Sequence, residues 1–79
     1  MTVTVEAYGK LIEIIPQPLR LDLPPGRVRD VIAALAEQFP GAAEDWPRVA
    51  VARGADILPR DAAIEPGDVL ALIPPVGGG

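Results

Sequence analysis

Four side-chain types that perform much of enzyme chemistry are missing from this 79-residue chain: cysteine, histidine, serine and asparagine. Their absence removes thiol and serine nucleophiles, the usual base near neutral pH, and the soft metal ligands. It also excludes an iron–sulfur cluster, which needs cysteine ligands. The hydroxyl groups that remain are those of Thr2, Thr4 and Tyr8, and the only lysine is Lys10. We therefore do not expect the chain to be an enzyme by itself.

Two pairs of carboxylates remain as candidates for acid–base chemistry. Glu44 stands beside Asp45, and Glu65 lies three residues before Asp68. Both pairs lie next to turn-forming sequences, where acidic side chains are ordinarily solvated rather than held in a site. We do not expect catalysis from either pair.

Length and charge restrict the kind of protein further. A chain of 79 residues forms one small domain, and 49% hydrophobic residues suffice for a core without disulfides. The net charge of −4 disfavours nucleic acid, which is bound by clustered basic residues, and suits a partner with a basic docking surface. No run approaches the ~20 apolar residues that cross a bilayer, and the first residues do not form a signal sequence. The sequence indicates a cytoplasmic protein without membrane or nucleic-acid partners.

The first half of the chain predicts two strands and a helix. Apolar residues alternate with polar ones over residues 2–8 and 19–23, which is typical of half-buried strands, and the short connection favours an antiparallel pair. A stripe with helical spacing follows, formed by Val28, Val31, Ile32, Leu35 and Phe39. Pro40-Gly41 ends this helix, but no Ser, Thr, Asp or Asn stands at its N-cap. The run Leu11–Ile15 fits either a helical turn or a strand.

The second half predicts three more strands. Residues 48–52 form one, Ile57-Leu58 forms a short edge strand, and residues 68–73 form the last, after a Pro66-Gly67 turn of type II. Period-two alternation places Leu70 and Leu72 on the face toward the helix, where we expect them to be buried with Leu35. Three residues should occupy the opposite face of the sheet: Ala50, Ala71 and Ile73.

The C-terminal sequence Leu72-Ile73-Pro74-Pro75-Val76-Gly77-Gly78-Gly79 is the most distinctive part of the chain. A packed strand leads into two prolines, which end ladder pairing because they lack an N–H group. Three glycines then follow, and glycine loses the most conformational freedom on ordering. We expect a folded domain over residues 1–76 and a flexible glycine tail over 77–79, slender enough to enter a narrow enzyme channel.

This element order and this ending resemble the ubiquitin-like β-grasp fold, and more narrowly the MoaD/ThiS family of sulfur carriers, the small subunits of molybdopterin synthase among them. The resemblance spans essentially the whole chain and is strongest from Glu65-Pro66-Gly67-Asp68-Val69 to the end. It implies an α+β fold: a mixed sheet of four to five strands packed on one main helix. In that family Pro-Pro-Val, one variable residue and Gly-Gly form the signature, so Gly78 and Gly79 are the functional pair and Gly77 fills the variable position.

The resemblance also implies a mechanism. A ubiquitin-activating-like (MoeB-type) adenylyltransferase would adenylate the Gly79 carboxylate, and a sulfur donor would convert it to a thiocarboxylate. The tail, threaded through Gly77 and Gly78, would then donate sulfur to the pyranopterin precursor inside the large (MoaE-type) subunit of molybdopterin synthase. No cofactor is assigned to this chain, since ATP and Mg would sit on the activating enzyme.

Partners need a surface that leads to this terminus. If Ala50, Ala71 and Ile73 lie on the uncovered face, they form with Pro74, Pro75 and Val76 an apolar strip that ends at the tail, and Ile73 is the candidate anchor. The sequence is also compatible with other functions. The chain could carry sulfur for thiamine thiazole, cysteine or tRNA thiolation, it could be a ubiquitin-like protein modifier, or it could be an interaction module with an incidental tail.

Overall fold

A computed structural model describes residues 1–75 of the chain as five strands, one α-helix and three short 3-10 helices. In chain order these elements are β1 (Thr2–Ala7), η1 (Gly9–Glu13), β2 (Leu19–Asp22), α1 (Val28–Gln38), η2 (Pro40–Ala42), η3 (Trp46–Arg48), β3 (Ala50–Arg53), β4 (Asp56–Leu58) and β5 (Val69–Ile73). The predicted strands and helix are all present. The run Leu11–Ile15, which fitted a helical turn or a strand, starts in the 3-10 helix η1 and contains no strand.

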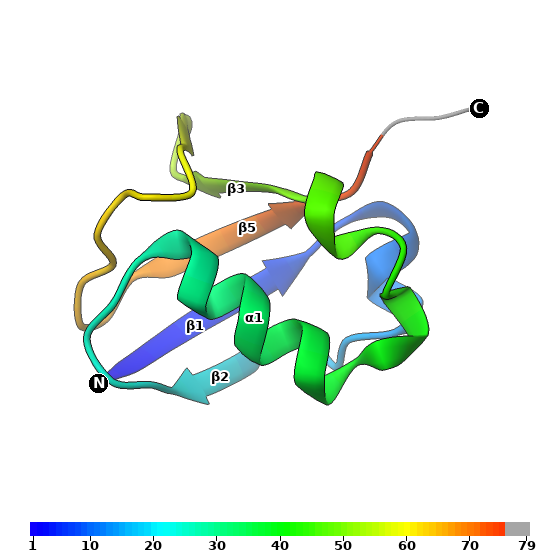
Figure 1. Ribbon diagram of the computed structural model, residues 1–79, viewed down its shortest axis with the longest axis horizontal. Helices are drawn as coiled ribbons and strands as arrows, with labels where there is room; N and C mark the ends of the chain where they lie inside the picture. The colour runs from blue at the N-terminus through cyan, green and yellow to red at the C-terminus, as the bar shows by residue number, and fades with distance from the viewer. Residues whose placement is uncertain (76–79) are drawn as a thin grey trace.

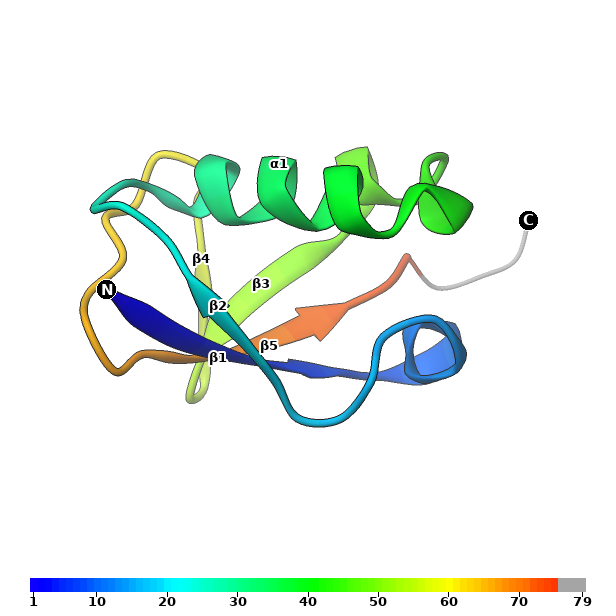
Figure 2. The ribbon, with the colours of Figure 1, turned by 90° about the horizontal axis from the view of Figure 1, so that it is seen from below.

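The strands form one mixed sheet in the order β2-β1-β5-β3-β4. β5 lies parallel to β1, and the other neighbours are antiparallel. Figure 1 shows α1 lying across the sheet, and Figure 2 shows the same helix as a separate layer on one side of it. This is the predicted α+β architecture, a five-stranded mixed sheet packed on one main helix.

The core lies between α1 and the sheet, where the alternation of the strands meets the stripe of the helix. Leu35, Leu70 and Leu72 have no exposed surface, as the sequence predicts, and Val3 and Val5 of β1 are equally buried. These side chains belong to one hydrophobic cluster. Leu11 and Ile15, at and after η1, extend the cluster, and Trp46 of η3 joins it with its Nε1 donating to the carbonyl of Phe39 at 3.0 Å.

The N-terminus of α1 compensates for its weak capping sequence with contacts from elsewhere in the chain. The Asp30 carboxylate accepts a hydrogen bond from the N–H of the N-cap residue Arg27 at 2.8 Å. The N–H groups of Val28 and Arg29 donate to the carbonyls of Ala62 and Arg60, each at 2.9 Å. The first N–H groups of a helix have no partner within the helix, so the carbonyls of the loop at residues 60–62 cap α1.

The turn before β5 also forms as predicted. Gly67 has a φ of +84°, and the Asp68 N–H donates to the Glu65 carbonyl at 3.1 Å, as expected of a type II turn with glycine in its third position. None of the helices within residues 1–75 is long and apolar enough to span a membrane.

Candidate functional site

The face of the sheet opposite α1 is the candidate site, because in residues 1–75 no helix covers it (Figure 2). Ala50 pairs with Ile73 across β3 and β5, and Ala52 pairs with Ala71. The three residues assigned to this face by the sequence, Ala50, Ala71 and Ile73, are half-buried, whereas Leu70 and Leu72 are fully buried. The two faces are therefore assigned correctly.

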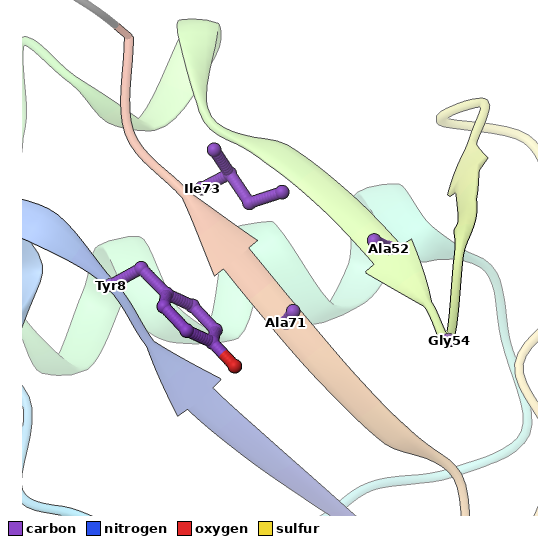
Figure 3. Close-up of a pocket in the computed structure, with 5 residues that line it drawn as sticks. All are labelled: Tyr8, Ala52, Gly54, Ala71 and Ile73. Atoms are coloured by element: carbon purple, nitrogen blue, oxygen red, sulfur yellow. The ribbon is translucent and has the colours of Figure 1, made fainter.

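A shallow apolar depression of about 400 Å³ lies on this face (Figure 3). It is lined by Tyr8, Ala52, Gly54, Ala71 and Ile73. The small residues of β3, β5 and the β3–β4 turn leave the space, and the larger side chains of Tyr8 and Ile73 stand beside it (Figure 3). Tyr8 is 49% exposed. Such a hollow suits a protruding apolar side chain of a partner better than a buried small molecule.

Sequence reasoning identified Ala71 and Ile73 in this depression but missed Tyr8, Ala52 and Gly54. A signal for two of these was present. Tyr8 stands two residues beyond Glu6 on the outer face of β1, and Ala52 stands two residues beyond Ala50, so extending the period-two alternation by one step finds both. The contribution of Gly54 depends on the β3–β4 turn and has no periodic signal.

The apolar surface continues beyond the depression. Val69 at the start of β5 and Ile57 on β4 are 50% and 62% exposed, and the strand register places both on this face. On the β1–β2 side the face becomes polar, with Thr4 paired to Arg20. An apolar band bordered by polar residues is the usual composition of a protein docking surface.

The chain leaves the sheet next to the depression. The Tyr8 N–H donates to the Leu72 carbonyl at 3.2 Å, Ile73 ends β5, and the half-buried Pro74 and Pro75 follow. The remaining predicted site residues, Val76, Gly77, Gly78 and Gly79, lie outside the described residues. The structure thus brings the docking candidates Ala50, Ala71, Ile73, Pro74 and Pro75 together around the C-terminal half of β5 and the two residues that follow it.

In each pair of carboxylates considered for acid–base chemistry, the aspartate is paired with a basic side chain. Asp68 accepts hydrogen bonds from Arg53 Nε at 3.2 Å and Nη2 at 2.7 Å, and from the Glu65 N–H at 2.8 Å. The hydrogen bond from Arg53 is the main reason that the pKa of Asp68 is lowered, so this group stays ionised near neutral pH. Asp45 pairs with Lys10 at 3.0 Å. Within residues 1–75 no group of three or more acidic residues is arranged to hold a metal ion.

Comparison of the sequence with known proteins covers the C-terminal residues as well. The family model described as "ThiS family" matches residues 5–79. No curated protein matches the chain significantly.

Three solved structures show the same fold. SAMP1 (small archaeal modifier protein 1) from Haloferax volcanii is 25% identical over 100% of both chains, with a TM-score of 0.81. A putative molybdopterin converting factor, subunit 1, from Pyrococcus furiosus is 24% identical over 95% of this chain and 98% of that one, with a TM-score of 0.83. A chain in the complex of subunits 1 and 2 of the molybdopterin-converting factor from Helicobacter pylori is 24% identical over 100% of both chains, with a TM-score of 0.69.

Proposed function

Since this chain belongs to the ThiS family of ubiquitin-like sulfur carriers, we propose that it carries sulfur as a thiocarboxylate on Gly79 and delivers it for molybdopterin synthesis in the cytoplasm. The observation that supports this most is the family match through residue 79, which includes Pro74-Pro75-Val76, the single residue Gly77 and the terminal Gly78-Gly79. The Pro74-Pro75-Val76 segment ahead of the terminal glycines is the feature by which the chain resembles the small subunits of molybdopterin synthase, and it favours the molybdopterin pathway over other sulfur pathways.

The proposed chemistry begins at the terminal carboxylate, which is a poor acyl donor because an oxide leaving group is unfavourable. An oxygen of the Gly79 carboxylate attacks the α-phosphorus of ATP, pyrophosphate departs, and a mixed anhydride with AMP forms. A sulfide equivalent from the sulfur donor then attacks the acyl carbon and expels AMP, leaving a thiocarboxylate. ATP and Mg²⁺ are assigned to the activating enzyme, and this chain supplies the acyl group and its presentation.

The uncovered face of the sheet is proposed as the surface on which the partners dock. It is apolar around β3 and β5, it carries a depression large enough for a protruding side chain, and it includes the end of β5. The similar chain from Helicobacter pylori comes from a complex of subunits 1 and 2, which favours a large subunit as partner here. We assign the contact to Ala50, Ala71, Ile73, Pro74, Pro75 and Val76.

A second candidate function is conjugation to other proteins. It is favoured by the likeness to SAMP1, a modifier by name, at 25% identity over the full length of both chains. In this case a lysine amine of the target attacks the activated acyl carbon of Gly79 and expels AMP, which forms an isopeptide bond. The two functions share the activation step and differ in the nucleophile.

The decisive experiment follows the mass of the chain. The purified chain, whose intact mass shows that it ends at Gly79, is incubated with the activating enzyme, ATP and a sulfide source. We expect a mass increase that corresponds to replacement of one oxygen by sulfur. The variant lacking Gly78 and Gly79 should show none, whereas Gly41→Ala, whose Cβ would meet no atom within 4 Å, should react like the wild type.

The second stage separates the two functions. The thiocarboxylated chain is mixed with the large subunit and the pyranopterin precursor, and the dithiolene product is measured. In parallel, a cell extract is searched for lysines that carry the C-terminal residues of this chain. Dithiolene formation supports the sulfur carrier. Lysine conjugates without any dithiolene would contradict it and favour the modifier.

A further inference from the structure

Gly9, the first residue of η1, lies against Pro74, the first residue after β5. The φ of Gly9 is +57°, in the left-handed region that side-chain-bearing residues rarely adopt. A Cβ at this position would lie 2.9 Å from Cγ of Pro74, closer than carbon atoms approach without a shift. Because the pyrrolidine ring is tied to the backbone and has only small changes of pucker available, the side chain cannot swing away, so Pro74 or the residues around position 9 would have to shift. Position 9 therefore requires glycine for two independent reasons, and one of them concerns the C-terminal segment.

The strand order places this contact where the chain leaves the sheet after β5. β5 runs parallel to β1 and antiparallel to β3, so its C-terminal end lies between the residues that follow β1 and those that precede β3 (Figure 1). The Tyr8 N–H holds the Leu72 carbonyl at 3.2 Å on the first side. Lys10 Nζ and Asp45 Oδ1, 3.0 Å apart, link the two flanking segments. The segment that contains Gly9 is thus tied both to β5 and to the approach to β3.

We propose that Gly9 is a positioning residue for the C-terminal segment: its missing side chain allows Pro74 to pack against the β1–η1 junction, and this packing sets the direction in which the chain leaves the sheet. This inference rests on the proposed function, because it concerns how the carboxylate of Gly79 is presented to a partner.

The expected consequence follows from chain length. The stretch from Pro75 to Gly79 reaches at most about 3.5 Å per residue, so the position of Pro74 determines which volume the carboxylate reaches. The uncovered sheet face orients the domain as a whole on its partner, whereas the Gly9–Pro74 contact orients the reacting end. A substitution at Gly9, which displaces Pro74 but leaves every residue of the proposed docking contact in the chain, should therefore lower the rate of the bound complex more than the strength of docking. Small displacements of reacting groups have large effects on rate.

The test compares Gly9→Ala with Gly67→Ala. Both glycines have positive φ values, +57° and +84°, but a Cβ at position 67 would meet no atom within 4 Å. Both variants should lose stability through backbone strain. Only Gly9→Ala should lower the kcat of thiocarboxylation by the activating enzyme, roughly tenfold or more, with a KM within about twofold of the wild type. Chemical denaturation gives the stability, and steady-state assays give kcat and KM.

A double-mutant cycle with Pro74→Ala, which removes the Cγ atom, isolates the contact. Each single variant should lower kcat, and the double variant should be no slower than the slower single variant, because both changes disrupt the same contact. If Gly9→Ala does not fold, Pro74→Ala, which introduces no left-handed strain, must by itself lower kcat about tenfold. Because Pro74 also belongs to the proposed docking contact, KM should rise in this variant as well, and kcat is the quantity that tests the positioning role.

The outcomes distinguish the two proposals. A wild-type chain that reacts, together with a Gly9→Ala or Pro74→Ala variant of unchanged kcat, would overturn the positioning role and leave the proposed function intact. Equal losses of kcat in Gly9→Ala and Gly67→Ala would also overturn it, because strain alone would then explain the effect. A wild-type chain that is never thiocarboxylated would overturn the proposed function and this inference with it.

Discussion

The two faces of the sheet are formed by the same strands but perform different tasks. Along β5, Leu70 and Leu72 point toward α1 and have no exposed surface, while Ala71 and Ile73 point away and are half-buried. Neighbouring residues of one strand thus belong to different environments. The face that is closed by α1 is apolar because folding buries it. The other face is apolar around β3 and β5 although folding leaves it open, and this exposed apolar surface is the reason that we propose it as the docking surface.

The two faces also differ in side-chain size and in how their borders are held. Large aliphatic residues fill the covered face, and the Arg53–Asp68 ion pair lies at its edge, directly before the start of β5. On the uncovered face, Ala52, Gly54 and Ala71 leave a depression instead of a packed layer. Stability should therefore depend on the first face and binding on the second, and substitutions can test each half of this statement.

The largest expected effect is in the core. Leu72→Ala should lower the free energy of unfolding by about 2–5 kcal/mol, because it leaves a cavity next to α1, and Leu35→Ala should do the same. The matched change on the uncovered face is Ile73→Ala, which should cost less than about 1 kcal/mol. Urea denaturation measures all three. Equal losses for Leu72→Ala and Ile73→Ala would remove the distinction between the faces.

A smaller effect is expected in binding. Ile73→Asp should weaken the complex with the large subunit at least about tenfold, or 1.4 kcal/mol, because the new charge would be buried at the centre of the interface. The control is Val69→Asp, at the other end of β5 on the same face, which should bind more tightly than Ile73→Asp. Titration calorimetry gives the affinity and circular dichroism the fold. Wild-type affinity would remove Ile73 from the interface, and an unfolded Ile73→Asp variant would mean that this side chain belongs to the core.

The smallest effect concerns pH. Asp68 has a lowered pKa in the folded chain, chiefly because of its hydrogen bond from Arg53, so its ionised form stabilises the fold. This contribution is complete above the ordinary carboxyl pKa of 3.8 and is lost as the pH falls through the lower folded value. Asp68→Asn should cost about 1 kcal/mol at neutral pH, since the partner Arg53 is partly exposed.

The measurement is urea denaturation of both proteins across a series of pH values. The difference between wild type and Asp68→Asn should shrink below about pH 4. A difference that stays constant down to the acid limit would show that the shape of this side chain matters more than its charge. In either case the affinity for the large subunit should not change, because Asp68 lies on the covered side of the sheet.

Much of this arrangement can be predicted from the sequence. Alternation identifies the strands and their faces, and the helical stripe identifies α1 and the burial of Leu35. The α1 cap could not be found this way, because its acceptors at Arg60 and Ala62 lie about thirty positions later in the chain. The burial of Trp46 is a similar case, since its Nε1 pairs with the Phe39 carbonyl across two turns. Arg60 Nη2 likewise donates to the carbonyls of Trp46, Pro47 and Val49, which no periodic pattern marks.

The same limit applies to the site. Residue alternation is sufficient to predict which side chains of β3 and β5 face away from the helix, because side-chain direction along a strand is a local property with a period of two. The position of β5 between β1 and β3, the place of Tyr8 beside the depression and the contact of Gly9 with Pro74 all depend on tertiary structure. These contacts join residues that are far apart in the chain, and their geometry depends on how the strands pair and how the sheet packs against α1. The local pattern therefore determines which side chains lie on each face of the sheet, and long-range packing determines where the chain leaves the sheet after β5.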